Sequence, residues 1–387
     1  MGKWKVKAAV VLMSLCQGLQ YTVSPVLNQI SRHYRSVPTS MIQTLVTAPA
    51  LASMVMALIS GWLVTKISKK TLVLSGSFLM GAMGLLPLLS DHFWVLFASR
   101  IMLGVGMGLL MALSTAVIAE HFEGGERSAT MGIQGASVGV GVLLASSLAG
   151  MVGKADFHAV YFIHLLAFAE MIGLALFLPE TGKTRLQTDE KLKINGRVLA
   201  LCALTFLEAM FFSAFTTNIA LHLVGDAGAV TARAGRLTAV FSATQIVAGM
   251  ALGFVSARTK RFTLSLGVLL CALGSLMLML SATEPVPLVL GAVLFGISQG
   301  LFVPHAMFEV SEMVSSASVA LASACLTVAI NVGQLVSPAA LNFTASSVLG
   351  RAGTRGVFES VAIGGAAAAL ISAALPFIQT VHKEEKT

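Results

Sequence analysis

The chain has 387 residues, of which 56% are hydrophobic and only 11% are charged, with a mean hydropathy of +0.87 and a formal net charge of +8. A soluble domain carries about 25% charged residues, so this chain has too little polar surface to coat a water-facing globule. Its apolar runs reach the ~20 residues that span the hydrocarbon of a bilayer, and they lack the short alternation of barrel strands. The sequence therefore predicts an all-α membrane protein.

Twelve membrane-spanning helices are predicted in chain order, near 8–30, 40–65, 71–90, 93–119, 128–152, 157–178, 198–223, 234–257, 262–282, 286–311, 318–343 and 354–378. The first span is too long, and too polar near its end, for a cleaved signal peptide. The longest polar segment, 180–197, is predicted to be a cytoplasmic linker. It separates an N-terminal six-helix bundle at 1–179 from a C-terminal six-helix bundle at 198–387.

The two halves repeat each other at an offset of 192 residues, the distance from Gly104 to Gly296. The residues that recur at this offset are Gly104, Gly108, Glu120 and Gly141, which return as Gly296, Gly300, Glu312 and Gly333. Two homologous, very apolar helical halves are typical of transporters that rock around a central site.

Basic residues predict the orientation. If the N-terminus is cytoplasmic, most of the 25 lysine and arginine residues lie on the cytoplasmic side, as in membrane proteins generally. Both termini are therefore expected in the cytoplasm, with the protein in the cell (inner) membrane. Anionic inner-leaflet lipid accounts for the net positive charge. We expect no nucleic-acid partner, because the sequence has no basic stripe with interleaved aromatic residues.

No motif for metal binding, nucleotide binding or hydrolysis is found, and the four cysteines are isolated within apolar spans. We therefore predict no metal, no cofactor and no enzymatic activity.

The segment from Gly61 to Lys70 reads Gly-Trp-Leu-Val-Thr-Lys-Ile-Ser-Lys-Lys between spans 2 and 3. It resembles the loop signature Gly-x-Leu-x-Asp-Arg-x-Gly-Arg-Arg/Lys of the major facilitator superfamily, except that Thr65 stands at the acidic position. A weaker copy runs from Gly253 to Arg261. The resemblance covers essentially the whole chain and implies twelve helices in two six-helix halves, working as a monomer.

The resemblance assigns a conformational role to six residues of these loops: Gly61, Lys66, Lys69, Lys70, Gly253 and Arg258. Because the motif's acid is missing, we predict that Glu120 or Glu126 pairs with Lys66 instead. The alternative is that the loop cations only set the orientation.

Two further family motifs have counterparts. The family's helix 4 often has an arginine followed by glycines, which matches Arg100 and Gly104. A membrane arginine requires water or a partner, and snorkelling to the interface is the alternative. The antiporter motif of helix 5 is matched in small-residue spacing from Gly132 to Gly150, without its proline. This favours an exporter, although helix packing alone explains small residues too.

Polar and aromatic residues at helical spacing in spans 1, 7 and 10 predict the substrate site, because the family lines its cavity with helices 1, 4, 7 and 10. The predicted substrate-binding residues are Gln17, Gln20, Tyr21, Asn28, Arg100, Phe211, Phe215, Asn218, Gln299, Phe302, Asn331 and Gln334. For Gln17, Asn28 and Gln299, hydrogen bonds between helices are the alternative.

Glu208 lies near the middle of its span, where a carboxylate is expensive to keep ionised and hence easily protonated. It is the predicted proton-coupling group, with Glu309 and His305 as further candidates. Solvation of Glu309 and helix packing of His305 are the alternatives. Glu170 in span 6 is a second buried acid, for which a structural role is predicted.

The sequence thus predicts a proton-coupled secondary transporter of small molecules that works by alternating access. An acid among aromatic residues suits an amphipathic cation, so export of drugs or metabolites in exchange for protons is the first hypothesis. The alternative is proton symport of a small organic anion, with Arg100 as its partner. A non-transporting membrane sensor is the hypothesis of another class. Protons, the small-molecule substrate and membrane lipid are the expected partners.

Overall fold

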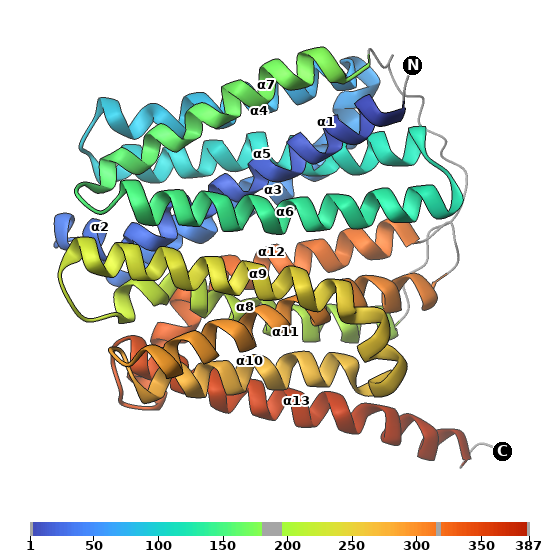
Figure 1. Cartoon of the computed structure of the whole chain (residues 1–387). Coiled ribbons are helices and arrows are strands. Elements are labelled where there is room, and N and C mark those ends of the chain that lie inside the picture. The colour runs from blue at the N-terminus through green and yellow to red at the C-terminus, as the bar shows by residue number, and fades with distance from the viewer. Residues whose placement is uncertain (1–2, 180–195, 315–318, 385–387) are drawn as a thin grey trace. The chain divides into compact units, whose positions relative to one another are not determined.

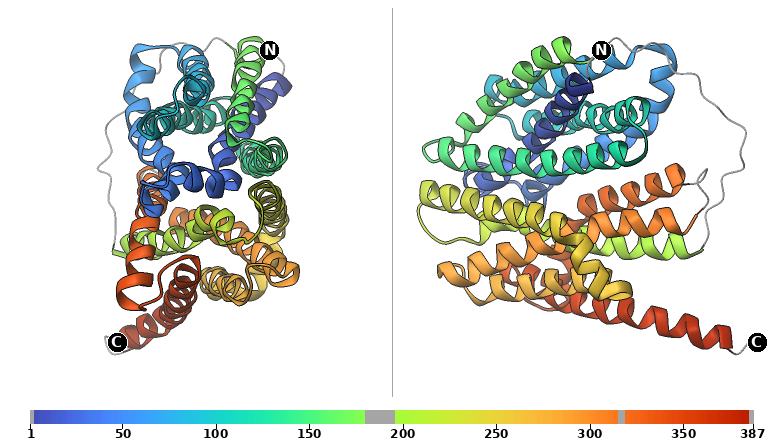
Figure 2. Two further views of the ribbon diagram at one scale, coloured as in Figure 1. Left: turned by 90° about the vertical axis from the view of Figure 1, so that its left-hand side faces the viewer. Right: turned by 45° about the vertical axis from the view of Figure 1, so that its right-hand side comes forward.

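A computed structural model describes residues 3–179, 196–314 and 319–384, and every regular element within them is a helix (Figure 1). The first half contains α1 (Lys3–Cys16), η1 (Gln17–Val26), α2 (Leu27–His33), α3 (Thr39–Lys66), α4 (Lys69–Leu85), η2 (Leu86–Leu89), α5 (Phe93–His121), α6 (Gly124–Val152), η3 (Phe157–His164) and α7 (Leu165–Phe177). The second half contains α8 (Gly196–His222), α9 (Ala227–Thr259), η4 (Lys260–Phe262), α10 (Thr263–Leu280), α11 (Pro285–Glu312), α12 (Val319–Phe343), η6 (Thr344–Val348) and α13 (Thr354–Glu384). Figure 2 shows the same helical elements from two further directions.

Eleven stretches of the described chain are long and apolar enough to cross a membrane, and one of them, Ala227–Leu280, has 54 residues. A straight helix of that length would measure about 80 Å, against a hydrocarbon core of ~30 Å. The chain instead turns at η4, where Lys260 has a φ of 47°, so this stretch holds two spans, α9 and α10 (Figure 1). The described helices thus correspond to the twelve predicted spans, and the predicted all-α membrane fold is confirmed.

The span predicted at 8–30 is helical, but in its middle η1 is a 3₁₀ helix of 10 residues and not an α-helix. Pro25 lies inside this segment and lacks the amide hydrogen that an α-helix interior uses. A 3₁₀ helix has 3.0 residues per turn, so the face that holds Gln17 continues through Gln20 and not through Tyr21. The predicted polar stripe is therefore rearranged at this point.

The described chain divides into two compact units. The first contains α1–α7 and α9 as far as Ala239, and the second contains α8, α9 from Val240 onward and α10–α13. Within the first unit, α5 packs against α3 and α4, and α6 packs against α1 and η1. Within the second, α11 packs against α10, and α12 packs against α8. Equivalent helices of the repeat thus make equivalent contacts.

The predicted linker at 180–197 lies outside the described residues except for its last two, which begin α8. The predicted boundaries of the two bundles, at 1–179 and 198–387, therefore stay a prediction.

Close backbone contacts recur at the repeated glycines. A Cβ atom at Gly104 would overlap the Pro49 backbone of α3, and one at Gly296 would overlap the Phe241 carbonyl of α9. Phe241 follows Pro49 by the same 192 residues that separate the two glycines, so the repeat preserves the contact as well as the residue. The arrangement recurs one turn further on at Gly108 against Ser53 and at Gly300 against Gln245. Small residues let membrane helices approach closely, which is the use that this spacing indicates.

Gly104→Ala and Gly296→Ala should each destabilise the protein by roughly 1–3 kcal/mol, because the added methyl group has to displace backbone. The measurement is thermal unfolding of the purified protein in detergent. Gly61→Ala is the matched control, since a Cβ there meets nothing within 4 Å. Equal melting temperatures for all three variants would show that the contacts are not required.

A polar cluster ties three chain segments together at one end of the first unit. Asp91, before α5, lies 2.8 Å from Nε2 of His33 and accepts a hydrogen bond from the Tyr34 hydroxyl at 3.1 Å. Nε2 of His158 is 3.6 Å from the same carboxylate, and Nδ1 of His158 is 2.8 Å from Asp156. Partial burial raises the pKa of Asp91, but the bonds from His33 and Tyr34 outweigh it, so the pKa lies below its usual value.

Asp91→Asn should lower the melting temperature modestly at pH 7, since the side chain is exposed and such contacts contribute little. The pKa of Asp91 is lowered on folding, so its contribution is present above the unfolded-state value of ~3.9 and lost as the pH falls through the folded-state value. In melting curves recorded from pH 7 to pH 3, the gap between variant and wild type should close below about pH 4. A gap that persists there would contradict this assignment.

Candidate functional site

Arg100 is enclosed within the first unit, with an exposed fraction of 2%. From α5, its Nε donates to the Leu45 carbonyl of α3 at 3.2 Å, and its Nη2 donates to the Gln20 carbonyl of η1. Nη1 has no hydrogen-bond partner among the described residues. The guanidinium therefore joins three chain segments and keeps one donor free, and burial rules out snorkelling to the interface.

Two polar groups that the sequence analysis missed accompany Arg100. The Tyr161 hydroxyl and Nε2 of His164, both in η3, are buried without a hydrogen-bond partner in the described part of the chain. Both residues interact electrostatically with Arg100. Buried polar groups are normally satisfied, so these atoms mark a region that water or a ligand can complete. The only signal for these two groups in the sequence was the presence of a tyrosine and a histidine inside the apolar sixth span.

The predicted polar residues of span 1 are only partly enclosed. Gln17 is buried, and its Nε2 donates to the Met13 carbonyl of its own chain segment at 3.4 Å. Gln20 and Tyr21 are half-buried, as is Asn28, whose Oδ1 is enclosed without a partner among the described residues. A substrate-binding role for these four side chains stays a prediction.

Glu208 is the enclosed acid of the second unit, with an exposed fraction of 1%. From α8, its Oε1 accepts a hydrogen bond of 2.6 Å from Nε2 of Gln299 in α11, which is itself buried. Its Oε2 has no partner in the described part of the chain. The carboxyl group is thus held at one oxygen and available at the other. The hydrogen bond between helices that was the alternative for Gln299 is present, with Glu208 as its acceptor.

The three phenylalanines predicted to contact substrate lie in the packed interior of the second unit. Phe215 and Phe302 are fully buried, and Phe211 is nearly so. The ring of Phe215 stacks on Phe241 at a centroid distance of 5.1 Å and lies 5.3 Å from Phe295. Contact of these rings with a substrate stays a prediction.

His305 and Glu309 form a separate pair on α11, with Nε2 and Oε1 3.3 Å apart. Glu309 is 27% exposed, whereas His305 is buried. Ten residues separate Gln299 from Glu309, about 15 Å along a helix, so Glu309 lies well away from the hydrogen bond between Gln299 and Glu208.

The remaining amides are on α8 and α12. Asn218 is buried, and its Nδ2 donates to the Ala214 carbonyl and the Thr217 hydroxyl, each at 3.0 Å. Asn331 and Gln334 are half-buried on α12. Binding of substrate by these amides stays a prediction.

Glu170 on α7 is a second enclosed acid, in the first unit, with an exposed fraction of 3%. Cys16 and Ser77 are its polar neighbours, but the Ser77 hydroxyl donates to the Val73 carbonyl at 3.2 Å. Neither carboxyl oxygen has a hydrogen-bond partner among the described residues. The structural role predicted for Glu170 stays a prediction.

The predicted pairing of Lys66 with Glu120 or Glu126 is wrong. Glu120 pairs with Lys69 at 2.6 Å, because Lys69 begins α4 and is turned into the bundle, whereas Lys66 is exposed. Glu126 instead pairs with two lysines of α1, Lys3 at 2.6 Å and Lys7 at 3.0 Å. Among the described residues, Lys66 has no ion pair.

The motif glycines are exposed at the ends of α3 and α9. A Cβ atom at Gly61 or Gly253 would meet nothing within 4 Å, so packing within the units does not require glycine at either position. Arg258 stacks on its own helix, with the guanidinium carbon 3.7 Å from the centre of the Phe254 ring. The conformational role of these loops stays a prediction.

The two units repeat each other, consist of helices long enough to cross a membrane, and each enclose ionisable groups. These features together define a multi-pass membrane transporter. A sequence model described as the Major Facilitator Superfamily matches residues 10–200 and 201–387. The chain belongs to this superfamily.

Two known proteins are similar in sequence to part of this chain. Quinolone resistance protein NorA of Staphylococcus aureus (strain MRSA252) is 26% identical over 186 residues, which cover 46% of this chain and 48% of NorA. Riboflavin transporter RibZ of Clostridioides difficile (strain 630) is 28% identical over 148 residues, which cover 37% of this chain and 32% of RibZ. The alignments thus span about half, or less, of these relatives.

Solved structures share the fold over nearly the whole chain. The POT family transporter PepTSo superposes with a TM-score of 0.80 at 12% identity, covering 98% of this chain and 99% of its own. The nucleoside transporter NupG superposes with a TM-score of 0.79 at 13% identity, covering 95% of this chain and 99% of its own.

Arg100→Ala should abolish most transport and lower thermal stability, because it leaves the Leu45 and Gln20 carbonyls without their donor. Arg100→Lys retains the charge but lacks the planar fork, so it should keep part of the activity. Uptake or efflux of a fluorescent substrate, together with melting curves, measures both effects. Arg35→Ala, at an exposed arginine of the same unit, is the control. Normal transport by Arg100→Ala would remove Arg100 from the site.

Proposed function

We propose that this transporter is proton-coupled and exports amphipathic drugs or metabolites in exchange for protons. The observation that carries the proposal is Glu208, which is enclosed in the second unit with one oxygen held by Gln299 and the other without a partner among the described residues. A coupled carrier requires a group that is charged in one state and neutral in another. A carboxyl with an unoccupied oxygen in an apolar enclosure supplies such a group, and the free Oε2 is where the proton would be carried.

Export is supported by the partial similarity to NorA, whose name describes it as a quinolone resistance protein. Glu208 shares α8 with Phe211 and Phe215, and an acid on a helix that also carries aromatic side chains suits a cationic, apolar substrate, through charge pairing and cation–π contact. The basic residues favour a cytoplasmic location for both termini in the cell membrane. In this proposal the protein works as a monomer and moves its substrate by alternating access.

Proton symport of a small organic anion is the second candidate. It is supported by Arg100, which keeps Nη1 free, and by the groups near it that lack hydrogen-bond partners among the described residues. The partial similarity to RibZ, named as a riboflavin transporter, also fits a substrate other than a cationic drug. The two candidates differ in direction, since an exporter lowers the intracellular concentration of its substrate and a symporter raises it.

Glu208→Gln tests the coupling. The amide mimics the protonated acid permanently, so the variant should still exchange substrate but lose transport driven by a pH gradient. Substrate movement is measured in proteoliposomes with and without an imposed gradient, using ethidium as an amphipathic cation. Glu284→Gln, at an exposed glutamate before α11, is the matched control.

Gradient-driven transport at the wild-type level by Glu208→Gln would contradict the assignment. The same assay on Glu309→Gln, His305→Gln and Glu170→Gln then identifies which other group carries the proton. Loss of coupling in Glu170→Gln alone would place the proton in the first unit.

A further inference from the structure

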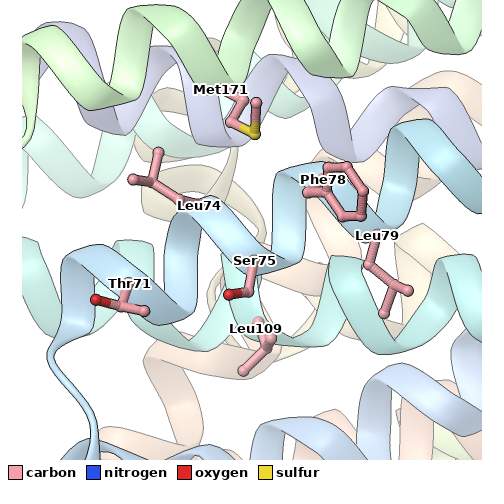
Figure 3. Close-up of a pocket in the computed structure, with 7 residues that line it drawn as sticks. All are labelled: Thr71, Leu74, Ser75, Phe78, Leu79, Leu109 and Met171. Carbon is pink, nitrogen blue, oxygen red and sulfur yellow. The ribbon is translucent and has the colours of Figure 1, made fainter.

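A groove of about 490 Å³ runs along the surface of the first unit between α4, α5 and α7 (Figure 3). Its floor is α4, which contributes Thr71, Leu74, Ser75 and Phe78, with Leu109 of α5 on one side and Met171 of α7 on the other. Its volume lies within the range of small-molecule sites, about 300–1,000 Å³. The walls are apolar, and the two hydroxyl groups lie along α4.

One end of the groove is cationic. Lys70 precedes Thr71, and its Nζ donates to the Ala175 carbonyl at 2.9 Å, one turn beyond Met171 on α7. Lys66 is exposed at the end of α3, just before α4 begins. Within the described residues, neither lysine has an ion pair, because Glu120, the acid of α5 at this end, pairs with Lys69.

Aromatic residues place this end of the unit at the membrane–water interface. Trp4 of α1 is 61% exposed and packs edge-on against Phe177 at the end of α7, with ring centroids 5.8 Å apart. Trp62, one turn before Lys66 on α3, is 58% exposed. Tryptophan is enriched where apolar and polar surroundings meet. From Thr71 to Phe78 the groove therefore extends about 10 Å from the interface toward the hydrocarbon.

We infer that this groove binds an anionic phospholipid. The headgroup phosphate contacts the ammonium groups of Lys70 and Lys66 and the Thr71 hydroxyl, and one acyl chain lies along Leu74, Phe78 and Met171. An amphiphile whose negative head is joined to an apolar chain matches a groove that is apolar along its length and cationic at its mouth. A helix of a partner protein would match the groove only if it carried an acidic side chain at the cationic mouth. The site is independent of the transported substrate.

The test measures lipid binding to the purified full-length protein in a non-ionic detergent by native mass spectrometry. Dioleoylphosphatidylglycerol should bind more tightly than dioleoylphosphatidylcholine. Lys70→Gln should weaken phosphatidylglycerol binding about fivefold, the change expected for one lysine near a lipid surface, and Lys70→Arg should restore it. Ser75→Trp should weaken both lipids, because the indole occupies the groove.

Two control variants separate this site from diffuse attraction. Lys5→Gln removes a lysine of α1 at the same end of the unit, and Ala169→Trp adds an indole to an exposed position of α7 away from the groove. Neither should change binding. The inference is overturned if Lys5→Gln weakens phosphatidylglycerol as much as Lys70→Gln does, if Ser75→Trp has no effect, or if inorganic phosphate displaces the lipid completely.

Discussion

Close backbone contact at glycine is the constraint on which both helical units depend. Lipid tails are as apolar as leucine, so membrane helices gain little from hydrophobic association and rely on packing at short range. Gly104 brings α5 onto α3 at Pro49, and Gly296 brings α11 onto α9 at Phe241. The exposed glycine at Gly61 has no such contact.

These contacts also place the polar groups. Arg100 lies one turn before Gly104, and its acceptor Leu45 lies four residues before Pro49, so the glycine contact carries the guanidinium to that carbonyl. Gln299 directly precedes Gly300, whose contact with α9 fixes the position of α11 beside Glu208. Packing determined by small residues therefore decides which polar side chains meet.

The repeat preserves packing but not chemistry. At the offset of 192 residues, Arg100 corresponds to Ala292 and Glu208 corresponds to Cys16, so neither of these two enclosed groups has a charged counterpart in the other unit. Enclosing such groups costs free energy unless they are hydrogen-bonded. Arg100 and Glu208 are each hydrogen-bonded at some atoms, and each has one atom without a partner among the described residues, which is unusual for a buried polar group.

The sequence alone determined the membrane class, the twelve spans, the repeat and Glu208 as an enclosed acid, because length, hydropathy and glycine spacing are properties of local segments. The tertiary structure decided the partners. The acceptors of Arg100 are backbone carbonyls, which every residue has and no side-chain pattern reveals. Lys69 rather than Lys66 pairs with an acid because of where α4 begins. The polar stripe of the first span changed because η1 has three residues per turn, and the bond from Gln299 to Glu208 depends on how α11 lies against α8.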